Sequence, residues 1–531
     1  MNRIPKVGVG MAVLVIAFVI SAVCALLFQT STMPLSRIWH DPYYLHVTGF
    51  SFYQSSLSTL ISIIGAIPVA RALHRRQFKG RNVLLKLFSM TLVLPVLVAV
   101  FGLLAIYGRS GWLATILHEF GLALPFNIYG LGGILLAHVF FNLPYASRLL
   151  LQSLQEIPED QHKLCAHLGM SGWQKFCLVE WPRLRQQLPH VGGLIFMLCF
   201  TSFATVMALG GGPKSTTIEL AIYQAIKYDF DLQTGALLAV WQMLLCSSLY
   251  FALHYFSRVM PVANGSISSA QMWSQDSRFS RLWDSLWIGL VIIFTVPPFI
   301  MVVGSGVNSS LADVLTSSAF WHALTTSVRI AVSASVVACT IGVTILLSSR
   351  HLRLRQHNTS ANGLELIGTI ILVTPGLVIS TGLFLLLRQW VDVFSHAYWV
   401  VVVVNALMAL PYVIKTLSQP LLHIEQQYQF LCASLGMQGW QRFKMVELKA
   451  LKGPLAQAFS LSFLLSLGDL SAIALFGNQD FRTLPLYLYQ LLGSYQTDAA
   501  AVVSLTLLLF SIGIFYLVEK VFSWQGRSET C

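Results

Sequence analysis

Charged residues are scarce in this sequence. Asp, Glu, Lys and Arg together make up 10% of its 531 residues, whereas 56% of the residues are hydrophobic. A soluble domain typically carries about 25% charged residues. The composition therefore excludes an ordinary soluble protein and indicates a chain that lies largely within a lipid bilayer.

Cysteine pairs at metal-binding or redox spacing are absent. The eight cysteines include no Cys-x-x-Cys pair, and seven of them fall in apolar runs or in segments that we predict to be cytoplasmic. We expect these thiols to be reduced and to pack inside the protein. The sequence predicts no metal site.

A phosphate-binding loop is also absent. The stretch "LGGGPKST" (209–216) resembles one, but Pro213 separates the last glycine from Lys214. The nucleotide-binding motif requires Gly directly before Lys, after a strand. We therefore expect no catalytic residue and no bound cofactor in this chain, and any ATP must be hydrolysed by a separate subunit.

Long apolar runs fill the rest of the chain. A bilayer core of about 30 Å takes about 20 helical residues to cross, and windows of that length give about twelve candidates. The runs do not alternate as barrel strands do, so the sequence predicts an all-α polytopic membrane protein. The candidate spans are 7–28, 52–73, 84–107, 128–151, 190–212, 235–257, 282–305, 322–347, 364–388, 397–418, 456–477 and 499–521.

Basic residues are distributed unevenly, which gives the orientation. The formal net charge is +12. If the N-terminus is cytoplasmic, Arg329 lies inside a span and the only basic residues on outer loops are Arg37, Arg109, Lys214, Lys227, Arg388 and Arg482. This asymmetry follows the positive-inside rule and predicts that both termini are cytoplasmic. The basic excess is explained by topology and does not indicate nucleic-acid binding.

The chain contains an internal repeat. The phrases "LCAHLGMSGWQKF" (164–176) and "LCASLGMQGWQRF" (431–443) share ten of thirteen letters at an offset of 267. The same offset relates Pro144 to Pro411, and a slightly larger one relates Pro95 to Pro375. Self-similarity over this distance predicts two copies of one structural unit.

The repeat divides the chain into two halves of about six spans each. Six crossings separate the two phrases, so both phrases must face the same side of the membrane. The halves are therefore parallel repeats about an axis along the membrane normal. We expect a first half over 1–258, a Ser-rich cytoplasmic linker over 259–281 and a second half over 282–531.

Each phrase is predicted to form a helix, a glycine break and a second helix. Gly169 and Gly436 stand where a helix end favours a left-handed residue, and Ser171 is a candidate N-cap. Two aromatic stripes follow, Trp173–Phe176–Val179 and Trp440–Phe443–Val446. Such a stripe either docks a partner or packs on the membrane domain. Two copies on one side of the membrane favour docking, since a two-fold partner needs two equal contact sites.

The phrases resemble a motif of the permease subunits of bacterial ATP-binding-cassette importers. In that family Ala-Ala-x-x-x-Gly, nine residues and Ile-x-Leu-Pro form a coupling helix that binds the ATPase. Segments 159–182 and 425–449 match it. The resemblance assigns ATPase coupling to Cys165, Ala166, Gly169, Trp173, Phe176, Val179, Trp181, Pro182, Cys432, Ala433, Gly436, Trp440, Phe443, Val446 and Leu448.

Two positions depart from the family motif. The family has Glu six residues before the glycine, where this chain has Lys163 and Phe430, and the closing proline is Lys449 in the second copy. An ion pair that the family's Glu makes with the ATPase is expected to be lost or to move to Glu159 or Glu425.

Over nearly its full length the chain is similar to the fused, two-half permeases of bacterial thiamine importers. The stretches that carry this similarity include "LVLPVLVAVFGLLAIYGRSGWLAT", "GILLAHVFFNLPYASRLLLQ" and "LFGNQDFRTLPLYLYQ". The resemblance implies transport of thiamine and its phosphates across the inner membrane, a periplasmic binding protein and two ATPase subunits that hold ATP-Mg. It also implies one permease chain per complex and no homodimer.

Charged and aromatic residues near the spans are candidates for the substrate path. A charge inside a span usually faces a protein interior or an aqueous path. Asp469, whose repeat partner is Ser202, is the clearest case: it either balances a cationic substrate, or anchors helices, or pairs with Arg329. Tyr223 and Tyr489 hold matched positions near the outer face and are candidates for a gate.

Two other functions remain open from the sequence. A permease for ferric iron or a polyamine would share all of these mechanical features. An ion-driven carrier is favoured only by the basic stretch "ALHRRQFKGR" (72–81), which inner-face topology already explains.

Overall fold

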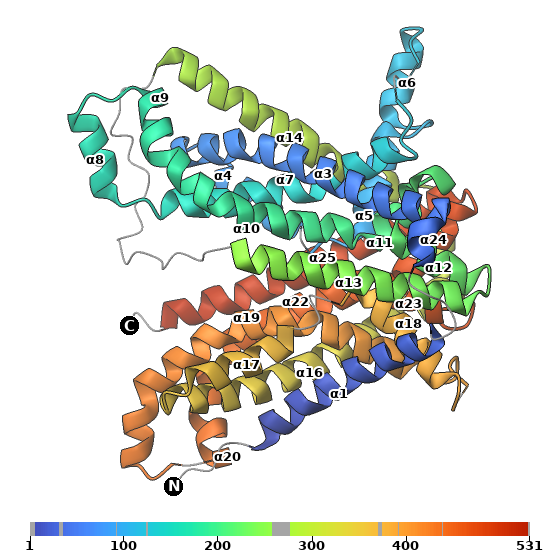
Figure 1. Ribbon diagram of the computed structural model, residues 1–531. Coiled ribbons are helices and arrows are strands. Elements are labelled where there is room, and N and C mark those ends of the chain that lie inside the picture. The colour runs from blue at the N-terminus through green and yellow to red at the C-terminus, as the bar shows by residue number, and fades with distance from the viewer. Residues whose placement is uncertain are drawn as a thin grey trace. The chain divides into compact units, whose positions relative to one another are not determined.

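Figure 1 shows the computed structural model, which describes residues 6–30, 36–91, 93–123, 126–256, 277–369, 374–390, 392–437 and 439–528. Every regular element in these ranges is helical, which confirms the all-α prediction. The predicted linker lies outside the described residues up to residue 276, and its last four residues begin helix α14 (Arg278–Gly306).

Two compact units divide the chain. We call residues 38–220 with 245–305 the first-half unit, and residues 1–37 with 221–244 and 306–531 the second-half unit. They differ from the sequence halves because α1 (Lys6–Gln29) belongs to the second-half unit and α14 to the first-half unit. Each half therefore contributes its first span to the other compact unit.

The first-half unit is built from helices of very different length. They are α2 (Arg37–His40), α3 (Pro42–Arg75), α4 (Arg81–Met90), α5 (Val96–Tyr107), α6 (Trp112–Glu119), α7 (Leu131–Gln155), α8 (Glu159–His167), α9 (Gly172–Lys175), α10 (Trp181–Phe200), α11 (Phe203–Leu209) and α14. The boundary between the units falls inside α12 (Ile218–Lys227) and again inside α13 (Leu232–Phe256).

The second-half unit repeats much of this order. Besides α1 it contains α15 (Leu311–Thr316), α16 (Ser318–Leu354), α17 (Asn358–Thr369), α18 (Gly376–Leu387), α19 (Ala397–Ser434), α20 (Gly439–Arg442), α21 (Leu448–Ala450), α22 (Lys452–Gly468), α23 (Ser471–Phe476), α24 (Leu484–Gly493) and α25 (Thr497–Ser528).

The same three-helix packing occurs in both units. Helices α3, α7 and α10 contact one another in the first-half unit, and α16, α19 and α22 do so in the second-half unit. These are repeat counterparts, since Pro144 in α7 matches Pro411 in α19. The repeat seen in the sequence is thus a repeat of packing.

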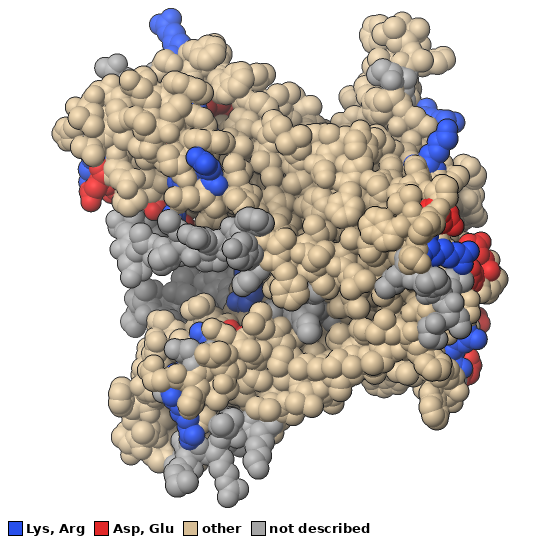
Figure 2. All heavy atoms as spheres, viewed as in Figure 1, with Lys and Arg blue, Asp and Glu red and all other residues tan. Residues whose placement is uncertain are grey.

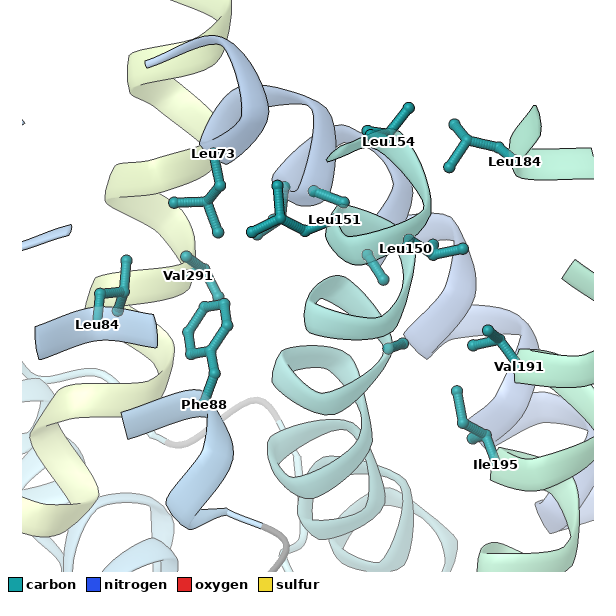
Figure 3. Close-up of a cluster of buried hydrophobic side chains, with 14 of the residues drawn as sticks. Leu73, Leu84, Phe88, Leu150, Leu151, Leu154, Leu184, Val191, Ile195 and Val291 are labelled. Carbon is teal, nitrogen blue, oxygen red and sulfur yellow. The ribbon is translucent and has the colours of Figure 1, made fainter. Parts of the chain in front are cut away.

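A cluster of buried apolar side chains explains why α14 joins the first-half unit. Figure 3 shows Leu73 of α3 and Phe88 of α4 close to Val291 of α14. Leu150 of α7 and Ile195 of α10 belong to the same cluster. In lipid such contacts stabilise mainly through close packing, because lipid tails are as apolar as the side chains.

The number of long apolar helices among the described residues is slightly below the roughly twelve spans predicted from the sequence. Among the described residues ten helices are long and apolar enough to cross a membrane, or eleven if the bent pair α10–α11 forms one span. The predicted span 364–388 falls on α17 and α18, between which residues 370–373 are not described. On the face that Figure 2 shows, charged side chains gather near the helix ends and the long sides are uncharged.

Matched prolines divide two of the predicted spans. Pro95 precedes α5 and Pro375 precedes α18, with ψ angles of 127° and 147°, outside the helical range. Proline lacks the N–H that a helix interior needs, and it also disfavours helical geometry in the residue before it. Each of these spans is therefore a short helix, a break and a second helix.

Candidate functional site

The glycine of each phrase ends a helix in the left-handed conformation. Gly169 and Gly436 both have φ of +63°, as predicted. Met170 donates a backbone hydrogen bond to the Cys165 carbonyl at 3.0 Å, and Met437 donates one to the Cys432 carbonyl at 2.9 Å. This six-to-one bond closes a helix C-terminus around a left-handed residue. We call 159–182 the first segment and 425–449 the second segment.

The predicted N-cap at Ser171 is present. The Gln174 backbone N–H donates to Ser171 Oγ at 3.3 Å, and the Ser171 N–H donates to Gln174 Oε1 at 2.8 Å. This reciprocal pair satisfies two amides that the first turn leaves free. The matching position in the second segment, 438, lies outside the described residues.

A π-helical turn follows the short helix in both segments. It covers Phe176–Glu180 in the first and Phe443–Glu447 in the second. The first turn continues into α10, and the second into the short α21, which precedes α22. The rings of Trp173 and Phe176 have centroids 5.5 Å apart. Phe176 and Val179 pack against the buried cluster of Figure 3, whereas Trp173 is 69% exposed. The predicted aromatic stripe is thus divided between the membrane domain and the surface.

The first segment exposes several large apolar side chains. Leu164, Leu168 and Leu178 are 58%, 68% and 67% exposed, respectively. Cys165 is buried and Trp181 is half-exposed, with its ring centroid 5.9 Å from that of Phe176. The apolar surface comes from the leucines and Trp173, and only part of it from the predicted stripe.

The second segment presents a matching surface. Leu431, Leu435 and Met445 are 53%, 64% and 50% exposed, and they correspond by the repeat to the three leucines of the first segment. Cys432 is buried, as Cys165 is, and Leu448 is half-exposed like Trp181. Trp440 lies in α20, but its side chain is outside the described atoms.

An arginine of α3 holds the first segment at three points. Arg71 Nε donates to Glu180 Oε2 at 2.7 Å, and another guanidinium nitrogen donates to the Gly172 carbonyl at 2.7 Å. The guanidinium also lies 4.4 Å from the centroid of the Phe176 ring. The Glu180 side chain is only 2% exposed, and Arg71 forms an ion pair with it.

A network of four charges holds the second segment. Arg350 of α16 pairs with Glu447 at 2.9 Å and with Glu425 at 3.2 Å. Arg442 pairs with the same two carboxylates, and its Nε lies 3.0 Å from Glu447 Oε1. The two glutamate side chains are at most 4% exposed, so positive and negative charges alternate within a nearly closed site.

The structure corrects one expectation about the missing family glutamate. Glu425 is 3% exposed and is bound by two arginines, so it does not lie on the surface where an ATPase would contact it. Glu159 is partly exposed and pairs with Lys163 at 3.3 Å. Burial makes an unpaired Glu425 costly, which explains why it turns towards Arg350 and Arg442.

A histidine of the first segment lies against a histidine of α3. The rings of His74 in α3 and His162 in α8 have centroids 5.7 Å apart, and both side chains are buried. Burial lowers the pKa of His162, and the Lys175 ammonium lowers it further. His162 is therefore neutral at pH 7.

Asp469 lies at the break between α22 and α23. Its Oδ1 accepts hydrogen bonds from the backbone N–H and the hydroxyl of Ser471, at 3.2 and 2.7 Å, and its Oδ2 accepts from the Ala472 N–H at 3.2 Å. These contacts anchor the start of α23. Among the described residues they match the anchoring alternative, and Arg329 packs on the Tyr398 ring at 5.8 Å instead.

The repeat partner of Asp469 is part of a neutral chain of hydrogen bonds. Ser202 stands at the bend of 52° between α10 and α11. Its hydroxyl lies 2.8 Å from His138 Nε2, and Ser58 Oγ lies 3.0 Å from His138 Nδ1. The two matched helix breaks are thus held by a carboxylate between α22 and α23 and by a buried histidine between α10 and α11.

The two candidate gate tyrosines belong to one aromatic cluster. Tyr223 of α12 lies with its ring centroid 5.6 Å from that of Tyr228. Burial raises the pKa of Tyr489 in α24, and the neighbouring Tyr228 raises it further. The structure therefore brings Tyr223, Tyr228 and Tyr489 together.

The buried charges of both segments were not predicted from the sequence. Glu180 and Glu447 follow the motif valine in both copies, and Arg71 and Arg350 lie near the ends of apolar runs. The occurrence of glutamate at the same repeat position in both copies could have predicted these buried charges. Its partner could not be read from the sequence, because Arg71 is 109 residues away.

The chain matches the family described as "Binding-protein-dependent transport system inner membrane component". The match occurs twice, over residues 58–260 and 341–522. Each matched region contains one of the two segments.

Curated relatives are similar to the chain over nearly its full length. A "Thiamine transport system permease protein ThiP" of Escherichia coli is 50% identical over 516 residues, which cover 97% of this chain and 96% of that protein. Proteins of the same name from Haemophilus influenzae and Brucella abortus are 44% and 37% identical, and about nine tenths of each is covered.

Proposed function

We propose a function for this chain from one established premise: it belongs to the family of binding-protein-dependent transport system inner membrane components. It is accordingly a multi-pass inner-membrane permease subunit of an importer, and its long apolar helices fit that location. The proposal concerns the solute, the partners and the contact surfaces.

We propose that the solute is thiamine, together with its phosphates. The near-full-length relatives named as thiamine permeases are the observation that supports it. The test is uptake of labelled thiamine by cells that lack their own thiamine permease and receive this chain. We expect uptake to be restored and to be reduced by excess unlabelled thiamine or thiamine phosphate. Competition by ferric iron or a polyamine, with none by thiamine, would contradict the proposal.

One permease chain is proposed to work with two ATPase subunits and one periplasmic binding protein. The chain supplies two matched segments, so two equal ATPases need no second copy of it. ATP-Mg binds in the partner ATPases, the permease holds no cofactor, and both chain termini are cytoplasmic. Dimerisation of the ATPases on ATP favours one state of the permease, and the resulting population shift provides alternating access. Uptake that survives deletion of the ATPase would favour an ion-driven carrier.

The ATPase contact is proposed to use the exposed apolar face of each segment. Leu164, Leu168 and Trp173 form this face in the first segment, and Leu431 and Leu435 form it in the second. Large apolar side chains exposed together mark a protein contact when they are rimmed by polar groups. The inward-facing Phe176 and Val179 contribute by fixing the segment on the membrane domain.

The residues proposed for the substrate path are Asp469, Ser202, Tyr223, Tyr489 and Arg329. The two roles proposed for Asp469, balancing the substrate charge and capping α23, predict different results for Asp469→Asn. Asn keeps an oxygen acceptor for α23 but has no charge. Unchanged thiamine uptake by Asp469→Asn, with reduced uptake by Asp469→Ala, would leave only the anchoring role.

A further inference from the structure

The strongest unassigned feature is an arginine–glutamate pair that occurs once in each unit. Arg71 of α3 binds Glu180 in the first segment, and Arg350 of α16 binds Glu447 in the second. The two glutamates are related by the repeat offset of 267, and the two arginines lie on counterpart helices. The other charges near each pair differ between the units.

Each arginine reaches the segment from a long membrane helix. Helix α3 has 34 residues and packs on α7 and α10, and α16 has 37 residues and packs on α19 and α22. A displacement that reaches α3 or α16 is therefore passed to the three-helix packing of that unit. Arg71 and Arg350 lie where a cytoplasmic contact and this packing meet.

The chemistry of the pair suits transmission of force. The arginine side chains are 15% and 12% exposed and the glutamates 2% and 3%. Separating Arg71 from Glu180 leaves a buried carboxylate without its ion-pair partner, whereas Glu447 separated from Arg350 still pairs with Arg442. The planar guanidinium of arginine has several N–H donors at fixed positions, so it can hold its acceptors in a fixed geometry. Arg71 uses them on the first turn of α9 and on the last residue of the π-helical turn, so it resists tilting of the segment as well as its withdrawal.

We propose that Arg71 and Arg350 are positioning residues that join the ATPase-binding segments to the membrane helices, through Glu180 and Glu447. They do not contact ATP or solute. They make each segment move together with α3 or α16 when the ATPases close. This role rests on the proposed function of the segments.

The two joints differ in strength. Removal of Glu180 leaves Arg71 without its carboxylate, whereas removal of Glu447 leaves Arg350 and Arg442 still beside Glu425. We therefore expect the first joint to be more sensitive to a single substitution than the second.

The test uses the full complex of permease, ATPase and binding protein in proteoliposomes. Three quantities are measured: ATPase that copurifies with the permease, ATP hydrolysis stimulated by loaded binding protein, and thiamine uptake. For Glu180→Gln we expect normal copurification and normal basal hydrolysis. Stimulated hydrolysis and uptake should fall about tenfold, within the range for residues that modulate coupling, and Glu447→Gln should cost only about threefold.

Two sets of variants make the test specific. Arg185 and Lys452 are exposed, lie five residues after each glutamate and are related by the same offset, so Arg185→Gln and Lys452→Gln should leave all three quantities unchanged. The charge exchange Arg71→Glu with Glu180→Arg restores an opposite pair. It should recover part of the stimulation lost in Glu180→Gln.

Several outcomes overturn the inference. Normal stimulation of ATP hydrolysis in Glu180→Gln would overturn it. Loss of ATPase copurification in the same variant would also overturn it, because Glu180 would then have a merely structural role. If Glu180→Gln does not accumulate in the membrane, Arg71→Lys is measured in its place, and normal stimulation there also overturns it. Failure of the unmodified complex to bind ATPase or to import thiamine instead overturns the proposed function.

Discussion

The two segments share a backbone and differ in what surrounds it. Both end a helix at a glycine with φ of +63°, continue through a π-helical turn and bury a glutamate. The first segment begins after a break at Pro158, which separates α7 from α8, whereas the second continues the 38-residue helix α19 without a break. Position 158 corresponds to Glu425, so the half that lacks the proline gains a carboxylate in its charge network.

This comparison shows which features both segments need in order to bind a partner. The surface offered to a partner and the buried glutamate occur in both copies. The arginine partner of that glutamate also occurs in both, whereas the additional carboxylate Glu425 and the helix break at Pro158 each occur in one copy only. Geometry at the contact is therefore kept, while the means of holding it differ between the units.

Removal of the shared apolar surface should have the largest effect. Leu168→Asp together with Leu435→Asp places a charge in each proposed ATPase contact, and both side chains are about two thirds exposed, so folding should be unaffected. Substitution at a central contact typically costs 2 kcal/mol or more, so we expect ATPase affinity to fall by more than about 30-fold. Copurification of ATPase with the permease measures this.

The neighbouring pair His167→Ala with Ser434→Ala is the matched control, since both residues are exposed and are repeat counterparts. A double aspartate variant that binds ATPase normally would place the contact elsewhere. Each single aspartate variant should bind at intermediate strength, because one surface remains.

Glu425→Gln should affect only the second segment. It leaves Arg350 and Arg442 to share Glu447, in a site where these arginine side chains are 12% and 20% exposed. Breaking a fully buried pair costs about 3–5 kcal/mol, and partial exposure reduces this, so we expect about 2 kcal/mol of lost stability.

Thermal unfolding of the purified permease checks the change in stability. The exposed neighbour Gln426 provides the control, and Gln426→Ala should change stability by less than about 0.5 kcal/mol. An effect of Glu425→Gln no larger than that of its neighbour is incompatible with a buried charge network.

Alanine substitution of either glycine should destabilise its segment by the same amount. Gly169 and Gly436 have the same φ, and an added Cβ would meet no atom within 4 Å at either. The cost is therefore the left-handed backbone alone, about 1–2 kcal/mol at each site. Hydrogen exchange of the amides after each glycine measures it, and a clearly unequal pair would show that the backbones are not equivalent.

Acid should weaken the first segment slightly more than the second. Burial and then Lys175 lower the pKa of His162, opposed by Glu180 and Glu159, and the second segment has Gln429 at this position. In the unfolded chain His162 takes up a proton near pH 6.5, whereas in the folded protein its pKa is lower. The first segment therefore keeps its full stability above that pH. Below it, protonation of His162 in the unfolded state lowers this stability by at most about 1.4 kcal/mol per pH unit.

Hydrogen exchange of residues 159–167 at pH 7.5 and 5.5 tests this expectation. His162→Gln copies the residue of the second segment and should remove the extra acid sensitivity. His74, which faces His162, remains in that variant, so the acid sensitivity that is left measures the contribution of His74.

The membrane class and the repeat were predictable because they depend on local composition and on identity at a fixed offset. The left-handed glycines were predictable because that conformation favours one residue type. The breaks at Pro95 and Pro375 were also visible as prolines, although the apolar runs around them indicated continuous spans. In each case the determining residues are neighbours in the chain.

Only the tertiary structure decided which side chains of the stripe turn inward and which charges pair. Phe176 and Val179 pack on the membrane domain while Trp173 stays exposed, and Arg71 meets Glu180 from 109 residues away. It also placed α1 and α14 in the unit of the opposite half. Apolar periodicity shows that a face is buried but not against which helix, because packing in lipid depends on the shapes that meet there.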